Sequence, residues 1–141
     1  MIYRETRDAT LINAIANLPE VRPHFSYHGN DLDFSPVLDA CVFLTNGEDA
    51  VGIFEERGVD GPEPGVWQAH TMFAPTCRGA KALTTARAML DHMKPHATAI
   101  WGTTPIKNKA ARWFNRKLGF VAIGFDTYEA EGPVELFLLR T

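Results

Sequence analysis

The sequence predicts a single domain of the mixed α/β (α+β) class over residues 1–141, with helices on both faces of a central sheet. Three observations support this prediction. The chain of 141 residues is long enough for one hydrophobic core and too short for two. Its hydrophobic content of 45% is ordinary for a globular protein. Short apolar segments that are typical of strands alternate with segments of helical periodicity.

Local sequence signals mark the ends of several predicted elements. Asp8 fits the N-cap of a first helix, and Asn46-Gly47 between two apolar segments indicates a hairpin. Pro95 ends the second helix, and Gly119 fits the C-terminal cap of the third. The predicted order begins with a strand over residues 1–5, a helix over 9–18 and a polar loop with a helical turn to 36. Strands over 40–45, 50–56 and 66–73 and a helix over 80–93 follow. The rest is a strand over 98–101, too short for more than a few ladder bonds, a helix over 106–118, and strands over 120–125 and 134–139 joined by a polar loop over 126–133.

Composition narrows the classes of function. The net charge of −3 argues against general nucleic-acid binding. No apolar segment approaches the roughly 20 residues that cross a bilayer, and the N-terminus lacks the apolar stretch of a signal peptide. Cys41 and Cys77 are too few for a disulfide framework. We therefore expect a cytoplasmic protein with no membrane or nucleic-acid partner.

The charge is unevenly distributed along the chain. Residues 1–77 carry twelve acidic and four basic groups, whereas residues 78–117 carry nine basic groups and one acidic group. A small ligand rich in phosphate would suit the basic segment. The alternative is that these lysines and arginines coat two exposed helix faces.

Two segments that contain or reach the basic region have the patterns of a ligand-binding site. In the first, a strand over residues 66–73 runs through Arg78-Gly79 into a helix, which is a natural anion site because free backbone N–H groups point outward there. In the second, a basic amphipathic helix begins at Asn108 and closes at Gly119-Phe120 before another strand.

Together, these segments and the element order resemble the GNAT family of N-acetyltransferases over essentially the whole chain. The resemblance implies a mixed, mostly antiparallel sheet that splays between its fourth and fifth strands. It implies acetyl-CoA as co-substrate, direct acetyl transfer to a primary amine of a small molecule or a protein, and no metal.

The resemblance also implies a set of cofactor-binding residues. In the family, a turn of pattern Gln/Arg-x-x-Gly-x-Gly/Ala holds the pyrophosphate of acetyl-CoA. Arg78 and Gly79 fit it, whereas Lys81 and Leu83 stand where small residues are expected, and Lys81 could instead bring an ammonium to a phosphate. Asn108 either contacts CoA or begins its helix. The expected cofactor-binding residues are Met72, Phe73, Arg78, Gly79, Ala80, Lys81, Asn108, Ala111 and Phe114.

The expected catalytic residues are His70 and Tyr128. The family often has a tyrosine as general acid where this chain has Phe114, which has no proton to give, so Tyr128 would replace it. His70 has the chemistry of a general base at neutral pH. Its alternative is a hydrogen-bonded histidine of a strand.

A second hypothesis is a binding or structural protein on the same scaffold that has lost catalysis. Residues 19–23, 70–75 and 78–79 resemble small GNAT-like proteins encoded by tailed bacteriophages, some of which are virion or head-assembly components. On this hypothesis the protein would bind another phage virion protein and would be located in the virion. A homodimer is the other protein–protein partnership left open. His92 and His96 have the spacing of helical metal ligands, but Pro95 between them stops the helix, so we expect no metal site.

Overall fold

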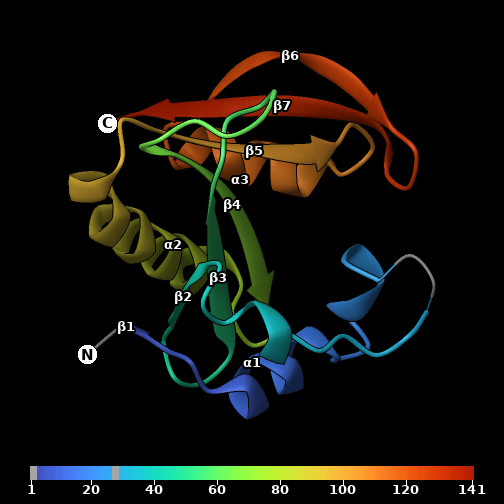
Figure 1. The fold of residues 1–141 in the computed structure, drawn as a ribbon. Helices are drawn as coiled ribbons and strands as arrows, with labels where there is room; N and C mark the ends of the chain where they lie inside the picture. The colour runs from blue at the N-terminus through green and yellow to red at the C-terminus, as the bar shows by residue number, and fades with distance from the viewer. Residues whose placement is uncertain (1–2, 27–28) are drawn as a thin grey trace. The chain divides into compact units, whose positions relative to one another are not determined.

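The structure is a computed structural model, and it describes residues 3–26 and 29–141 (Figure 1). Met1 and Ile2, the start of the predicted first strand, lie outside the described residues. The helices are α1 (Ala9–Ala16), α2 (Gly79–Met93) and α3 (Lys109–Lys117), with short 3-10 helices at Arg22–His24, Ser35–Val37 and Lys94–His96. The strands are β1 (Arg4–Glu5), β2 (Val42–Thr45), β3 (Ala50–Glu56), β4 (Val66–Phe73), β5 (Ala99–Pro105), β6 (Val121–Tyr128) and β7 (Gly132–Arg140).

The hydrogen-bonded strand order is β1-β2-β3-β4-β5-β7-β6. The β1–β2, β2–β3, β5–β7 and β6–β7 pairs are antiparallel, and β4 pairs with β5 in parallel. This confirms the mixed, mostly antiparallel sheet. The three register pairs of β4 with β5 run from Val66 to Gln68, in the first half of β4, and the splay of these strands stays a prediction.

The chain groups into two compact units. The first comprises the residues up to Glu55 and His70–Met89, and the second comprises Glu56–Ala69 and Leu90–Thr141. The single domain expected from the length therefore stays a prediction. Of the helices that the structure describes, none combines the length and the apolar character needed to cross a membrane.

The core of the first unit forms around α1. The Asp8 carboxylate accepts the N–H groups of Thr10 and Leu11 at 3.0 and 3.3 Å, which confirms the predicted N-cap. Ile12 and Ile15 are buried on the sheet side of the helix. The Asn17 side chain holds the loop that follows α1. Its Nδ2 donates to the Leu32 carbonyl oxygen at 2.8 Å, and its Oδ1 accepts the Leu32 N–H at 2.6 Å. The loop contains two 3-10 turns rather than the one helical turn expected.

The second unit corrects the predicted bounds of one strand and one loop. All seven residues of β5 pair with β7, so the prediction of a strand confined to 98–101 is wrong. The polar loop predicted over 126–133 is also wrong at both ends, because β6 continues to Tyr128 and β7 begins at Gly132. Polar side chains on these strands hid the extension, since cross-strand hydrogen bonds depend on the backbone rather than on side-chain polarity.

Candidate functional site

The predicted site residues fall into two groups, one in each unit. Those in the first unit lie on β4 and at the start of α2, and they are His70, Met72, Phe73, Arg78, Gly79, Ala80 and Lys81. Those in the second unit lie on α3, at its N-cap and on β6, and they are Asn108, Ala111, Phe114 and Tyr128.

The turn between β4 and α2 exposes backbone to solvent. Gly79 is the first residue of α2 and has a φ of +60°, a left-handed conformation that costs other residues about 1–2 kcal/mol. A Cβ at this position would meet no atom within 4 Å, so the space in front of the backbone is open. The first N–H groups of a helix have no acceptor inside it and attract anions. An anion can therefore approach the backbone closely at Gly79.

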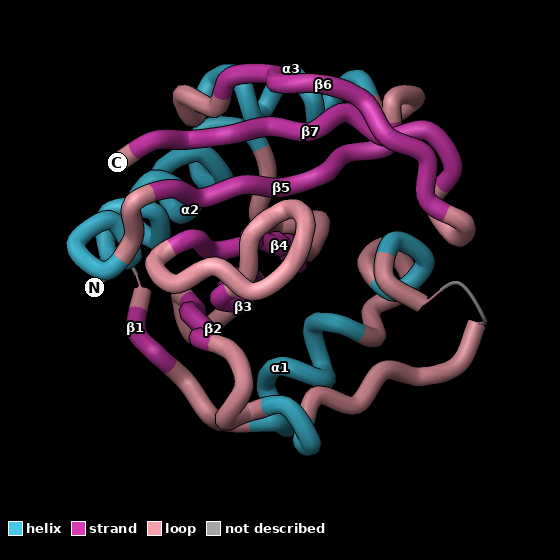
Figure 2. Tube along the Cα trace, turned by 45° about the horizontal axis from the view of Figure 1, so that its top comes forward, coloured by secondary structure: helices cyan, strands magenta, loops and turns pink. Residues whose placement is uncertain are grey.

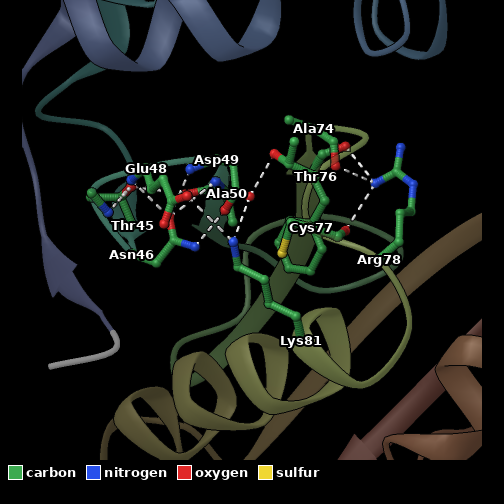
Figure 3. Close-up of polar contacts among 12 residues, drawn as sticks. Thr45, Asn46, Glu48, Asp49, Ala50, Ala74, Thr76, Cys77, Arg78 and Lys81 are labelled. Carbon is green, nitrogen blue, oxygen red and sulfur yellow. Dashed lines mark hydrogen bonds and ion pairs between the residues drawn. The ribbon is translucent and has the colours of Figure 1, made fainter.

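The Arg78 side chain holds this turn. Its Nη1 donates to the carbonyl oxygens of Phe73, Ala74 and Cys77 at 2.7, 2.9 and 3.1 Å (Figure 3). The rest of the exposed guanidinium points away from the turn. Arg78 thus fixes the backbone with one nitrogen and presents positive charge with the others.

Lys81, by contrast, is engaged by carboxylates (Figure 3). Its Nζ lies 2.7 Å from Asp49 Oδ2 and 3.6 Å from a Glu48 oxygen. Asp49, only 5% exposed, also accepts from Thr76 Oγ1 and Asn46 Nδ2, both at 2.7 Å. Burial raises the pKa of Asp49, but the hydrogen bonds from Lys81, Thr76 and Asn46 outweigh burial and keep that pKa below its ordinary value.

This carboxylate cluster links the β2–β3 hairpin to the first turn of α2. Sequence reasoning missed it, because Asn46-Gly47-Glu48-Asp49 has the composition of a simple turn. The role of Lys81 as a phosphate ligand stays a prediction.

The β4 residues differ in exposure. Met72 is fully buried in the core of the first unit, packed with Ile12, Val51 and Ile53, and its expected role in cofactor binding stays a prediction. His70 and Phe73 are half-buried, and the Phe73 carbonyl is taken by Arg78. The assignment of His70 as a base stays a prediction.

In the second unit, Asn108 is the N-cap of α3. Its Oδ1 accepts the Ala111 N–H at 3.1 Å, so Asn108 does begin its helix. This bond uses only the oxygen of the amide. Within residues 3–26 and 29–141, the Nδ2 group makes no hydrogen bond and can still donate one to a ligand.

A buried glutamate that sequence reasoning missed fixes α3. Glu135 is 4% exposed on β7, and its Oε1 accepts from Arg112 Nε at 2.9 Å and from Arg116 Nη2 at 3.3 Å. Arg112 also donates to the Ile106 carbonyl at 3.1 Å. The sequence held one signal of this network, the acidic residue inside the apolar segment 134–139. A carboxylate in such a segment is expected to be buried, and buried carboxylates are almost always paired with a basic group. The network holds the segment just before Asn108.

Tyr128 is the last residue of β6 and is half-buried. Burial raises the pKa of its phenol, and the carboxylates of Asp126 and Glu131 raise it further, against a smaller opposing effect of Arg57. Tyr128 therefore keeps its proton at neutral pH and has it to donate. Phe114 is half-buried on α3 and has no such proton.

Comparison with solved structures gives high-coverage matches at low sequence identity. AAC(6')-Ib in complex with ribostamycin and coenzyme A matches with a TM-score of 0.77 and 16% identity, over 98% of this chain and 92% of that chain. A spermidine N-acetyltransferase SpeG variant from Vibrio cholerae matches with a TM-score of 0.73 and 14% identity, over 99% and 95%. YncA from Salmonella typhimurium, with its cofactor acetyl-CoA, matches with a TM-score of 0.73 and 15% identity, over 98% and 92%.

No protein-family model and no curated protein matches the sequence. The fold assignment therefore rests on structural similarity, and the observed strand order and the parallel β4–β5 pair agree with it. This chain has the GNAT fold.

Proposed function

We propose that this chain is an acetyl-CoA-dependent N-acetyltransferase that acts on a primary amine. The observation that carries the proposal is the β4–α2 turn, where open backbone at Gly79 lies beside the anchored guanidinium of Arg78. Such a pairing suits the pyrophosphate of CoA, because charge-assisted hydrogen bonds and helix N–H groups both favour phosphate. The choice of ligand is supported by the coenzyme A and acetyl-CoA bound to structural neighbours.

The reaction would be direct transfer. His70 accepts a proton from the substrate ammonium, and the free amine attacks the thioester carbonyl. A backbone N–H of β4 near Phe73 stabilises the oxyanion of the tetrahedral intermediate. As the C–N bond forms and the C–S bond breaks, the departing thiolate would take the proton of Tyr128, and the Tyr128 oxygen would then take the second proton that the attacking nitrogen must lose to become an amide.

The acceptor would be cationic. Residues 1–77 carry three times as many acidic as basic groups, which attracts a positively charged amine. Spermidine, after which the SpeG enzyme is named, and ribostamycin, which is bound in the AAC(6')-Ib complex, are the acceptors to assay first.

A second candidate is a protein of the same fold that binds without catalysing transfer. Two observations favour it: Phe114 stands where a tyrosine acid is common, and the Lys81 ammonium already contacts Asp49. The two candidates differ in turnover. Release of free thiol from acetyl-CoA, dependent on an added amine, supports the enzyme; binding of acetyl-CoA without amine-dependent thiol release supports the second candidate.

The phosphate contact is tested by replacing Arg78 and comparing two acyl donors. We expect Arg78→Gln to weaken acetyl-CoA binding about 10-fold or more, because a charged hydrogen-bond partner contributes about 1.5–3 kcal/mol. S-acetylpantetheine has no pyrophosphate, so its affinity should hardly change.

The matched control is Arg87→Gln, which removes the same charge from an exposed position of the same helix. Both variants should be checked for folding by thermal unfolding. Equal losses of acetyl-CoA affinity in the two variants, or equal losses for both donors in Arg78→Gln, would contradict the placement of the pyrophosphate.

A further inference from the structure

Arg57 has a buried hydrogen-bond donor without an acceptor. It follows directly after β3 and is half-buried. In the part of the chain that the structure describes, its Nε is buried and has no hydrogen-bond partner. Buried polar groups are almost always paired, and an unpaired one in a charged side chain calls for an explanation. Arg57 is therefore a candidate for a role that the fold alone does not require.

The backbone of Arg57 is fixed on one face of the sheet in the second unit. Its carbonyl oxygen accepts the indole N–H of Trp101 on β5 at 2.8 Å. Trp101 is only 2% exposed and packs in an apolar cluster of that unit. The next residues are held as well, because the Gly58 N–H donates to the Gly61 carbonyl oxygen at 2.7 Å. The position of Arg57 over this face is thus set by buried contacts.

Tyr128 lies on the same face. β5, β7 and β6 run side by side with β7 in the middle (Figure 2). Trp101 is opposite Leu138 of β7, and Tyr128 is opposite Gly132. Opposite residues share a face, and Leu138 and Gly132 are six positions apart, so both pairs lie on one face. Glu135 is three positions from either residue, so the arginines of α3 that bind it are on the other face.

The charges that act on Tyr128 come from three segments. Asp126 precedes it on β6, Glu131 lies in the turn to β7, and Arg57 comes from the segment after β3. Burial and the two carboxylates raise the pKa of the phenol, and the Arg57 guanidinium lowers it. Because part of this guanidinium is shielded from water, its field is screened less than that of an exposed cation. An oxyanion at Tyr128 would be disfavoured by the carboxylates and favoured by Arg57.

We propose that Arg57 is a positioning residue that acts through Tyr128: its guanidinium stabilises the phenolate that forms when the phenol gives its proton to the departing thiolate. The phenolate then takes a proton from the attacking nitrogen, and Arg57 again faces a neutral phenol. This inference rests on the proposed function, because Tyr128 loses its proton in that reaction. Arg57 is what allows a phenol beside two carboxylates to act as an acid.

Titration of Tyr128 tests the electrostatic contact without any substrate. NMR of tyrosine that is isotope-labelled at the carbon bearing the hydroxyl follows the phenol, and Tyr128→Phe assigns its signal. We expect Arg57→Gln to raise the pKa of Tyr128 and Arg57→Lys, which keeps the charge, to restore most of it. Arg140→Gln is the matched control, because Arg140 is an exposed cation at the other end of β7. It should leave the pKa of Tyr128 unchanged, and thermal unfolding shows that each variant is folded.

Turnover of acetyl-CoA with spermidine or ribostamycin tests the positioning role. Arg57→Gln should leave KM for acetyl-CoA unchanged and lower kcat by less than the roughly 100-fold expected for loss of the acid in Tyr128→Phe. The alkaline limb of the pH profile of kcat should move to higher pH, because the protonated phenol is the active form and its pKa is raised in this variant. Added to Tyr128→Phe, Arg57→Gln should have no further effect on kcat.

The titration and the turnover assay distinguish failure of this role from failure of the proposed function. An unchanged pKa of Tyr128 in Arg57→Gln, or an equal rise in Arg140→Gln, overturns the role of Arg57 whether or not the chain is active. A raised pKa in a chain without amine-dependent turnover overturns the proposed function, and the catalytic role of Arg57 with it. A loss of kcat that is equally large in the Tyr128→Phe background shows that Arg57 does not act through Tyr128, and also overturns the proposal.

Discussion

Gly79 is the residue on which the backbone geometry of the β4–α2 turn most depends. Its positive φ and the open space beside it both follow from the missing side chain. The motif Arg78-Gly79 could be found in the sequence because it lies within one turn. The Asp49–Lys81 pair could not, because its partners are 32 positions apart and only the fold brings them together.

A methyl group at Gly79 should interfere with phosphate binding. We expect Gly79→Ala to weaken CoA binding several-fold, because the left-handed φ becomes strained by about 1–2 kcal/mol and the Cβ enters the open space. Gly132→Ala is the matched control, since Gly132 also has a positive φ of 71° and open space beside it but is the first residue of β7. Calorimetric titration and thermal unfolding of both variants check this; similar losses of affinity in the two would contradict it.

Asp49 should make stability depend on pH in the acid range. Its pKa is lower in the folded state than the ordinary value of about 3.9, so the unfolded chain binds more protons there. The ionised carboxylate therefore stabilises the fold above about pH 4, and this contribution is lost as the pH falls through the folded pKa. Urea unfolding from pH 7 to pH 3 should show a shallower acid decline in Asp49→Asn than in the unmodified chain.

Asp39→Asn is the control for the loss of a carboxylate at the surface. Asp39 is exposed and pairs with Arg7, so its replacement should change the free energy of unfolding at pH 7 by no more than about 1 kcal/mol. An unchanged decline in Asp49→Asn would show that the cluster with Lys81, Thr76 and Asn46 does not set the pKa.

At the scale of elements, periodicity and end signals located most helices and strands. The predicted bounds of β3 and β4 are confirmed, and α2 differs by one residue at its start. The helices predicted over 9–18 and 106–118 are shorter in the structure, and the strand predictions fail where polar residues take part in strands, as in the second half of β5 and around the β6–β7 turn. There the length of a strand depends on its hydrogen bonds to the neighbouring strand, and a single sequence does not show which strand is the neighbour.

The attachment of α3 should depend on Glu135. We expect Glu135→Ala to lower the free energy of unfolding by about 1.5–3 kcal/mol, because it removes the charged acceptor of two partly exposed arginines. Glu129→Ala removes an exposed carboxylate of the same hairpin and should change it by less than about 0.5 kcal/mol. Urea unfolding measures both, and equal effects would mean that the buried network contributes nothing specific.

At the scale of the whole molecule, the resemblance of two short segments and of the element order anticipated a mixed, mostly antiparallel sheet of the GNAT type, and solved structures under 20% identical share this fold. The pattern of elements alone reached only the mixed α/β class. The identity of the amine was not predictable, because acceptor recognition depends on side chains of loops that have no common pattern.

Calorimetric titration of the unmodified chain with acetyl-CoA tests the proposed function most directly. We predict saturable binding in the micromolar range with one site per chain, and similar binding of CoA, because the pyrophosphate contact is common to both. Absence of binding at millimolar acetyl-CoA would contradict the proposal and leave the fold without its expected cofactor.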